Sequence, residues 1–387
     1  MGPLTGRTII EIAGIGPGPF AGMLLADMGA RVIRIERPGG SLFSNAQEPR
    51  LDFLNRGKPC LALDLKHPDA VAAVLKMLPE AHGLIEGNRP GVMERLGLGP
   101  DVCLATNPAL VYGRMTGWGQ QGPWAQKVGH DINYVALSGA LHPMGRAGEK
   151  PAIPLNLVGD FGGGGLMLAF GIVAALLEAT GSGKGQVVDA AMIDGAATLM
   201  ASTFAASQAG FWRPERGTNF LDGGAHFYEV YETSDGQYLS LGAIEPQFYA
   251  ELLDVLEENA SEFANQWDMD NWPAMKEKLA RIIRTRPLAE WDTVFNDRDV
   301  CYAPVLSIDE VRQHPHHQAR STFVDDGDYW QPAPAPRFSR TPGVISGNAD
   351  RVGGSTETVL SEFGFDVAEI EQLLTSGAAA NHAAEPA

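Results

Sequence analysis

The feature that most constrains this chain is a strand, a helix and a second strand within its first forty residues. Residues 7–14 read RTIIEIAG, a β-branched strand, and residues 30–38 read ARVIRIERP, a second strand that Pro38 stops. Between them, FAGMLLADMG at 20–29 predicts a helix that ends at Gly29. A strand, a helix and a strand of this length form a βαβ unit, which belongs to a parallel sheet.

The alternation of strands and helices continues toward residue 200. A helix is predicted at 68–80, and strands are predicted at 82–86 and 109–115. A chain of 387 residues is too long for one ordinary core. We therefore expect an α/β fold with a large Rossmann-like domain over residues 1–200.

The sequence pattern changes after residue 215, and this change predicts a smaller α+β domain. Residues 227–243 alternate, turn on Ser-Asp-Gly and alternate again, which is typical of a hairpin. Helices are predicted at 246–257, 273–285 and 288–296. The expected boundaries are a linker at 201–224, the small domain at 225–325, a proline-rich extended linker at 326–345, closing helices at 346–375 and a disordered tail at 376–387.

The charge and the cysteines of the chain exclude several classes of function. A formal net charge of −18 argues against nucleic-acid binding and against adhesion to an anionic membrane. The three cysteines are isolated, which excludes a disulfide scaffold and a cysteine zinc site. The HPHH stretch at 314–317 is interpreted as a solvated loop, and no metal is expected. No secretory signal is visible, so we expect a cytoplasmic protein, with the apolar run 161–177 as a buried helix.

Two further stretches suggest where a ligand binds. The segment 31–95 holds ten Arg or Lys and eight Asp or Glu, a local charge of +2 in an acidic chain. Such an island suits a small polyanion, although scattered solvated charges would look the same. The GIGPGP stretch at 14–19 resembles a dinucleotide fingerprint, but Pro19 occupies its third glycine position. We interpret it as a tight turn and not as an NAD site.

Two titratable residues stand beside helix-starting stretches. His130 lies in GHDINY (129–134), and Asp160 lies in NLVGDFGGGG (156–165). Aspartate suits a helix N-terminus, and a glycine run lets a ligand reach backbone N–H groups. Each residue alone is equally compatible with a structural role, as a capping or core histidine and as a plain N-cap. No G-x-S-x-G motif supports a serine hydrolase.

Several long motifs together resemble one family, the α-methylacyl-CoA racemases of the family III CoA-transferase superfamily. The motifs are IEIAGIGPGPFAGMLLADMGA, RPGVMERLGLGP, GHDINYVALSGAL, PLNLVGDFGGGGLM, GKGQVVDAAMIDG, LDGGAHFYEVY and GAIEPQFY, within residues 3 to about 370. The resemblance implies the family III CoA-transferase fold and a homodimer of interlocked rings. The closing helices would then pack on the large domain, and the active site would lie where that domain meets the partner's small domain. CoA is part of the substrate, so no separate cofactor is expected.

The resemblance also implies roles for individual residues. His130 and Asp160 look like an acid/base pair, and Glu245 resembles a carboxylate that the small domain brings near Asp160 across the dimer. The residues that resemble the CoA- and thioester-binding positions are Arg37, Leu63, Asp64, Leu65, Lys66, Arg89, Gly129, Asp131, Ile132, Asn133 and Tyr134.

Inverting a carbon next to a thioester requires two proton carriers, one on each face of that carbon. A nearby Glu245 would raise the pKa of Asp160 by repulsion, and backbone N–H groups near Asp160 would hold the enolate oxygen. The alternatives are a CoA transferase, in which Asp160 attacks the acyl-CoA and carries an anhydride, and a non-catalytic CoA-binding protein. His130 favours the racemase, because a transferase needs no histidine there.

Overall fold

The computed structural model describes residues 2–40, 48–256, 263 and 265–382. They divide into two compact units. The first comprises Met1–Ser138, Leu155–Leu199 and Ser321–Ala387, and the second comprises Gly139–Pro154 and Met200–Arg320. The predicted large domain of residues 1–200 included the segment Gly139–Pro154, which groups instead with the second unit. Arg216 ties this segment to the second unit, because its Nε donates a hydrogen bond to the carbonyl of His142 (2.8 Å).

The first unit is built on a seven-stranded sheet in the order β12-β3-β2-β1-β4-β5-β6. Its strands are β1 Thr8–Ile12, β2 Arg31–Glu36, β3 Cys60–Leu63, β4 Gly83–Glu86, β5 Val111–Thr116, β6 Val187–Ala191 and β12 Ala379–Ala380. Strands β1 to β6 pair in parallel, and β12 pairs antiparallel with β3. The order 3-2-1-4-5-6 is that of dinucleotide-binding sheets, so the predicted α/β class is confirmed.

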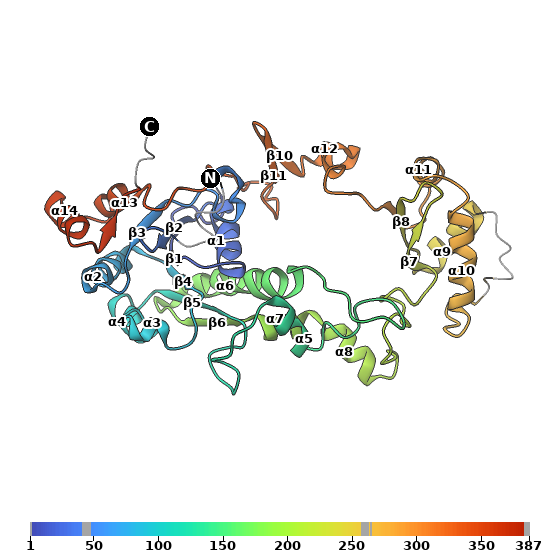
Figure 1. The fold of residues 1–387 in the computed structure, drawn as a ribbon, viewed down its shortest axis with the longest axis horizontal. Helices are drawn as coiled ribbons and strands as arrows, with labels where there is room; N and C mark the ends of the chain where they lie inside the picture. Colours follow the sequence, from blue (N-terminus) through green and yellow to red (C-terminus); the bar gives the residue numbers. More distant parts are fainter. Residues whose placement is uncertain (1, 41–47, 257–262, 264, 383–387) are drawn as a thin grey trace. The chain divides into compact units, whose positions relative to one another are not determined.

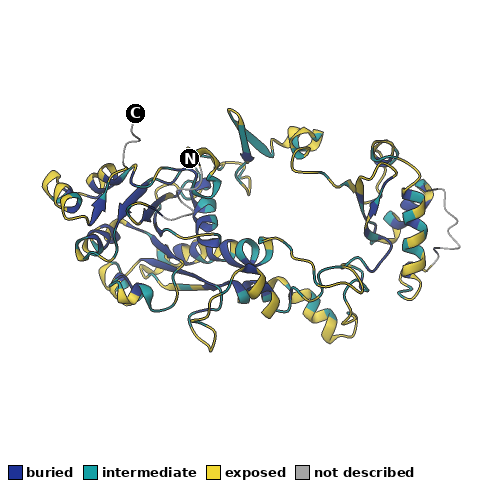
Figure 2. Ribbon diagram, in the orientation of Figure 1, coloured by how far each residue is buried: buried dark blue, intermediate teal, exposed yellow. Residues whose placement is uncertain are grey.

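Successive residues of the strands face opposite sides of the sheet, and helices cover both sides (Figures 1 and 2). Ile9, on one side, belongs to a core shared with α1 (Pro17–Asp27) and α6 (Met167–Ser182). Ile10, on the other side, belongs to a core shared with the remaining helices. Those helices are α2 (Pro68–Met77), α3 (Val92–Arg95), α4 (Pro100–Thr106), α13 (Thr356–Glu362) and α14 (Val367–Thr375).

Helix α1 begins at Pro17, three residues before the predicted start at residue 20. Proline suits the first helical positions, because the N–H that it lacks would have no partner there. Gly16 precedes the helix with φ +68°, a conformation that glycine adopts without strain. Residues 14–16 therefore form the predicted turn from β1 into α1, whereas residues 17–19 of the GIGPGP stretch are already helical.

The apolar run was expected to be a buried helix, and it is buried on one face only. It forms the π-helix η4 (Leu157–Leu166), which continues as α6. The stretch Leu157–Ser182 is long and apolar enough to cross a membrane, by length and composition alone. Leu168 and Ile172 pack in the sheet core, whereas Phe170 is 71% exposed.

The structure of the C-terminal part differs from the sequence prediction in two places. The tail at 376–387 was expected to be disordered, but Ala379 and Ala380 pair with β3 and cover its edge. Residues 383–387 lie outside the described residues. The extended linker at 326–345 begins as part of a hairpin of β10 (Phe323–Asp326) and β11 (Tyr329–Pro332). The ring of Trp330 packs edge-on against Phe323 in this hairpin (5.0 Å), which stabilises the pairing.

The second unit is an α+β structure around an antiparallel sheet. Strands β7 (Tyr228–Glu232) and β8 (Tyr238–Gly242) form the predicted hairpin, and β9 (Tyr302–Pro304) extends it. Its helices are α8 Ala201–Gln208, α9 Pro246–Val255, α10 Trp272–Ile283, α11 Leu288–Phe295 and α12 Pro315–Arg320. The three predicted helices correspond to α9, α10 and α11, and residue 257 lies outside the described residues.

Candidate active site

The predicted CoA-binding residues of the first unit follow the carboxyl ends of its parallel strands. Arg37 follows β2, the stretch 63–66 ends β3, Arg89 follows β4, and His130 lies in the segment after β5. The strand order reverses between β1 and β4, where open α/β sheets bind their ligands. The fold therefore places these stretches along one edge of the sheet.

Three exposed cations lie along this edge. Arg37, Lys66 and Arg89 are all exposed, and the Nε of Arg37 donates to the carbonyl of Gly40 (2.6 Å). Exposed cations that follow strand ends suit an anionic ligand, because the fold holds their backbones while their charges remain accessible.

The other residues of the stretch 63–66 have structural contacts. Leu63 is 1% exposed, and Leu65 packs against the core that contains Ile10. The side chains of both leucines therefore contact the protein interior. The N–H of Asp64 donates to the carbonyl of Ala378 (2.9 Å), which docks the C-terminal strand. Leu63 and Leu65 can therefore offer a ligand mainly their backbone.

His130 is exposed and immediately precedes helix α5 (Asp131–Leu137). Its backbone N–H donates to Oδ1 of Asn133 (3.0 Å), which fixes the start of the helix. Tyr134 is buried, and its hydroxyl donates to the carbonyl of Gly129. Ile132 and Asn133 are exposed. The segment 129–134 is therefore held from inside by Tyr134, while His130 faces outward.

Asp160 lies on the π-helix η4, a rare geometry that is frequent at functional sites. Its Oδ2 accepts a hydrogen bond from Nδ2 of Asn156 (3.2 Å), and its backbone N–H donates to Oδ1 of Asp131 (2.7 Å). A Cβ built on Gly16 would lie 2.9 Å from its Oδ2. Asn156 thus holds the carboxyl group of Asp160, Asp131 holds its backbone, and the turn at Gly16 lies close to one carboxyl oxygen.

His130 and Asp160 are close enough to interact electrostatically. Burial raises the pKa of Asp160, the hydrogen bond from Asn156 and the charge of His130 lower it, and the charge of Asp131 raises it, so that the net shift is upward. The like-charge neighbour in this unit is thus Asp131. Glu245, which was predicted to have this effect, lies in the second unit, and its role near Asp160 stays a prediction.

The backbone N–H of Asp160 and two of the glycines that follow it have partners within the protein. The N–H of Asp160 already has an acceptor in Asp131, so it is not a free donor for an enolate. Gly163 and Gly165 are buried, and a Cβ on either would lie 2.6 Å from backbone atoms of Ala196 or Pro17. These glycines therefore let η4 pack closely on α7 (Met192–Leu199) and α1, rather than admitting a ligand.

Sequence reasoning missed Gly16 and Asn156 as neighbours of Asp160. Asn156 stands four residues before Asp160, a spacing that places both side chains on one side of a helix, so a signal was present. Gly16 was interpreted correctly as a turn residue, but no local pattern relates residue 16 to residue 160.

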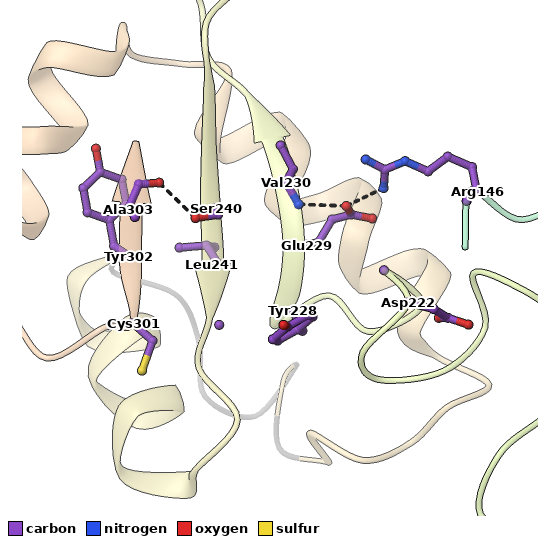
Figure 3. Close-up of a pocket in the computed structure, with 13 residues that line it drawn as sticks. Arg146, Asp222, Tyr228, Glu229, Val230, Ser240, Leu241, Cys301, Tyr302 and Ala303 are labelled. Atoms are coloured by element: carbon purple, nitrogen blue, oxygen red, sulfur yellow. Dashed lines mark hydrogen bonds and ion pairs between the residues drawn. The ribbon is translucent and has the colours of Figure 1, made fainter. Parts of the chain in front are cut away.

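The second unit has a cavity of about 540 Å³ whose wall includes Arg146, Glu229 and Cys301 (Figure 3). Burial raises the pKa of the Cys301 thiol in its wall, and the charge of Glu245 raises it further. Glu245 is exposed and directly precedes α9. The buried carboxylate of Glu229, also in the wall, pairs with Arg146 and with Lys276 (2.6 Å for the latter). Glu229 is thus neutralised within this unit, whereas Glu245 remains accessible.

The HPHH stretch is not the solvated loop that was predicted. Pro315 starts helix α12, and His314 and His317 are half-buried in the wall of a second cavity of about 460 Å³. Within the described ranges, no cluster of three His, Cys, Asp or Glu side chains has a geometry that could hold a metal ion. The histidines of this stretch line that cavity together with Asp292 and Arg298.

Comparisons with known proteins identify the family of the chain. Residues 4–356 match the family described as CoA-transferase family III. The chain is 47% identical over 372 residues to the alpha-methylacyl-CoA racemase of Mus musculus and 45% identical over 374 residues to that of Homo sapiens, with 96% of each chain covered in both cases. A CAIB/BAIF family protein from Brucella suis has a similar solved structure, with a TM-score of 0.80, 25% identity, and coverage of 94% of this chain and 99% of that one.

Proposed function

This chain belongs to CoA-transferase family III, and from that premise we propose that it is a racemase that inverts the α-carbon of 2-methyl-branched acyl-CoA thioesters. The observation that carries the proposal is that Asp131, which directly follows His130, accepts the backbone N–H of Asp160 at 2.7 Å. This hydrogen bond brings the His130 segment beside Asp160, thirty residues away in sequence, at the carboxyl edge of the sheet. Two different proton carriers at one place are what 1,1-proton transfer requires.

In the proposed reaction, one member of the pair removes the α-proton, and the electron pair of the broken C–H bond moves into the thioester carbonyl to form an enolate. The other member then donates a proton to the opposite face of the carbon. The upward shift of the Asp160 pKa makes its protonated form more accessible than that of an ordinary aspartate, and we assign Asp160 as the acid and His130 as the base in this direction. Inversion in the other direction exchanges these roles.

The enolate oxygen needs donors. The N–H groups of Asp131 and Ile132, in the first turn of α5, have no acceptor among the residues that the structure describes. They adjoin His130 and support a role as the oxyanion donors.

For the remainder of the substrate, we propose that Arg37, Lys66 and Arg89 bind the phosphates of CoA. We propose further that the enzyme is a cytoplasmic homodimer with its active site at the subunit interface, completed by Glu245 of the small domain. Glu245 and His130 are exposed and Asp160 is half-buried, so another subunit could reach these side chains in such a dimer.

The decisive experiment follows the α-proton of each enantiomer of a 2-methylacyl-CoA in deuterated buffer by NMR. The wild-type protein should exchange the proton and invert both enantiomers. His130→Ala and Asp160→Ala should each lose inversion by at least about 10²-fold, the contribution of one acid or base group. Each variant should also stop exchanging one enantiomer, and the affected enantiomer should differ between them.

Two other outcomes would replace the proposal. Transfer of CoA to an added carboxylic acid, without α-exchange and dependent on Asp160, would indicate a transferase in which Asp160 forms the anhydride. Binding of acyl-CoA with neither reaction would indicate a non-catalytic CoA-binding protein.

A further inference from the structure

Among the residues that the structure describes, Asp131 is a buried carboxylate without a cationic partner. It is 7% exposed, and its Oδ1 accepts the backbone N–H of Asp160 at 2.7 Å. Its Oδ2 is also buried and has no hydrogen-bond partner within the described ranges. Burying a carboxylate with so little compensation is unfavourable, so stability alone does not explain an aspartate at this position.

The surroundings of Asp131 are shaped to admit this carboxylate. A Cβ built on Gly159 would lie 2.5 Å from its Oδ1, so only glycine at residue 159 allows the close approach. Asp131 also directly follows His130 in sequence. Its carboxylate therefore joins the backbone beside His130 to the backbone of Asp160.

The charged groups around the Asp160 carboxyl are few. Asp131 and His130 face it from the segment that starts α5, and Asn156 donates to it from its own helix. From the turn before α1, the residue that lies against the Asp160 carboxyl is Gly16, which has no charged side chain. Tyr134, also on α5, interacts with both aspartates. Burial and the charges of the two aspartates raise the pKa of its phenol, whereas the charge of Arg89 lowers it. Asp131 is thus the one negative charge that shifts the pKa of Asp160 within the described part of this unit.

We infer that Asp131 is a positioning residue for the proposed reaction: its carboxylate clamps the backbone of Asp160 beside His130 and places a negative charge near the Asp160 carboxyl. This inference rests on the proposed function for its kinetic consequences, but its electrostatic consequence holds whatever reaction the site performs. The negative charge opposes ionisation of Asp160, so that residue retains a proton to a higher pH.

Two variants separate the charge from the geometry. Asp131→Asn keeps an oxygen that can accept the Asp160 N–H but removes the charge. Gly159→Ala keeps the charge but forces the carboxylate to move. Asp189→Asn is the matched control, because Asp189 also accepts a backbone N–H, from Gln120 at 3.2 Å, and is exposed and outside the proposed site.

The first readout is the ¹³Cγ resonance of Asp160 in aspartate-labelled full-length protein, assigned by its loss in Asp160→Asn and titrated by NMR. In Asp131→Asn the midpoint should fall by about one pH unit, because a like charge near the carboxyl has been removed. Asp189→Asn should titrate like the wild type. An unchanged or raised midpoint in Asp131→Asn overturns the inference, whether or not the protein is a racemase.

The second readout is the pH profile of α-proton exchange for each enantiomer. In Asp131→Asn, the limb that reports Asp160 should move to lower pH for both enantiomers, and kcat/KM on that limb should change about tenfold for each pH unit that the limb moves. Gly159→Ala should lower the plateau of kcat at least tenfold, since displacement of a reacting group is costly. A plateau equal to wild type in Gly159→Ala would refute the clamp. A wild-type protein that exchanges no α-proton would instead refute the proposed function and leave the NMR titration as the test of Asp131.

Discussion

Replacing Gly16 by alanine should damage the site through one identifiable atom. Gly16 adopts φ +68° directly before α1, and its added Cβ would lie 2.9 Å from Oδ2 and 3.4 Å from Cγ of Asp160. Real Cβ atoms essentially never approach another heavy atom so closely. Either the turn or the carboxyl group of Asp160 must move in Gly16→Ala.

Two separable costs follow from this geometry. An alanine forced to positive φ destabilises the fold by about 1 kcal/mol or more. The contact with Asp160 requires a shift of several tenths of an ångström, and a misplacement of about 1 Å at a reacting group can cost about 10²-fold in rate. We therefore expect the free energy of unfolding to fall by about 1–2 kcal/mol and kcat to fall about 10- to 100-fold.

Two other glycines of the same unit serve as matched controls. Gly6 also has a positive φ (+84°) but nothing within 4 Å of its built Cβ, so Gly6→Ala has the strain alone. Gly14, in the same turn, has neither the strain nor a close contact. In urea unfolding, Gly16→Ala and Gly6→Ala should have a lower free energy of unfolding than the wild type, and Gly14→Ala should have nearly the same value. The rate of α-proton exchange should fall in Gly16→Ala alone. Equal exchange rates in Gly16→Ala and Gly6→Ala would refute the reasoning.

Three more predictions follow from buried or exposed charges. Lys58→Met should lower the free energy of unfolding in urea by about 3–5 kcal/mol, because it leaves Glu11, paired at 2.8 Å, buried without its cation. Adding Glu11→Gln should recover part of the loss, and no recovery would contradict the pairing argument. Burial lowers the pKa of His226 from 6.5 to about 4. As the pH falls from 6.5 to 4, this histidine is protonated in the unfolded chain but remains neutral in the native state. The free energy of unfolding should therefore drop by up to about 3 kcal/mol over that window. His226→Gln should flatten this part of the pH–stability curve, and an unchanged slope would assign the loss to other groups. Arg37→Ala should weaken CoA binding about tenfold or more in calorimetry, and an unaltered affinity would remove Arg37 from the proposed CoA site.

The sequence predicted the parts of the fold that depend on local pattern. The first βαβ unit and the hairpin of β7 and β8 follow from periodicity and turn chemistry, and the structure confirms them. The errors lie where pairing joins distant residues. No local pattern in 376–380 indicates a strand, because β12 forms only by covering the edge of β3, more than 300 residues earlier.

The glycine run shows the same limit at the site itself. Four consecutive glycines are compatible with ligand contact and with close helix packing, and the sequence alone does not separate the two. The structure separates them through the atoms that a side chain would meet: Gly163 lies against α7, and Gly165 lies against the start of α1. Likewise, the π-helical geometry of 157–166 has no simple periodicity in sequence, since it depends on this packing.

The close packing brings two other segments to Asp160, in addition to the hydrogen bond from Asn156 on its own helix. The glycines bring η4 against α1, so the turn at Gly16 reaches one carboxyl oxygen of Asp160. The same packing brings Gly159 against Asp131, so the helix that follows His130 reaches the Asp160 backbone. The loop after β1 and the segment after β5 thereby meet at one residue that lies on neither strand. A substitution that loosens this helix contact, such as Gly163→Ala, should therefore impair exchange of both enantiomers together, whereas loss of either proton carrier alone should impair them unequally.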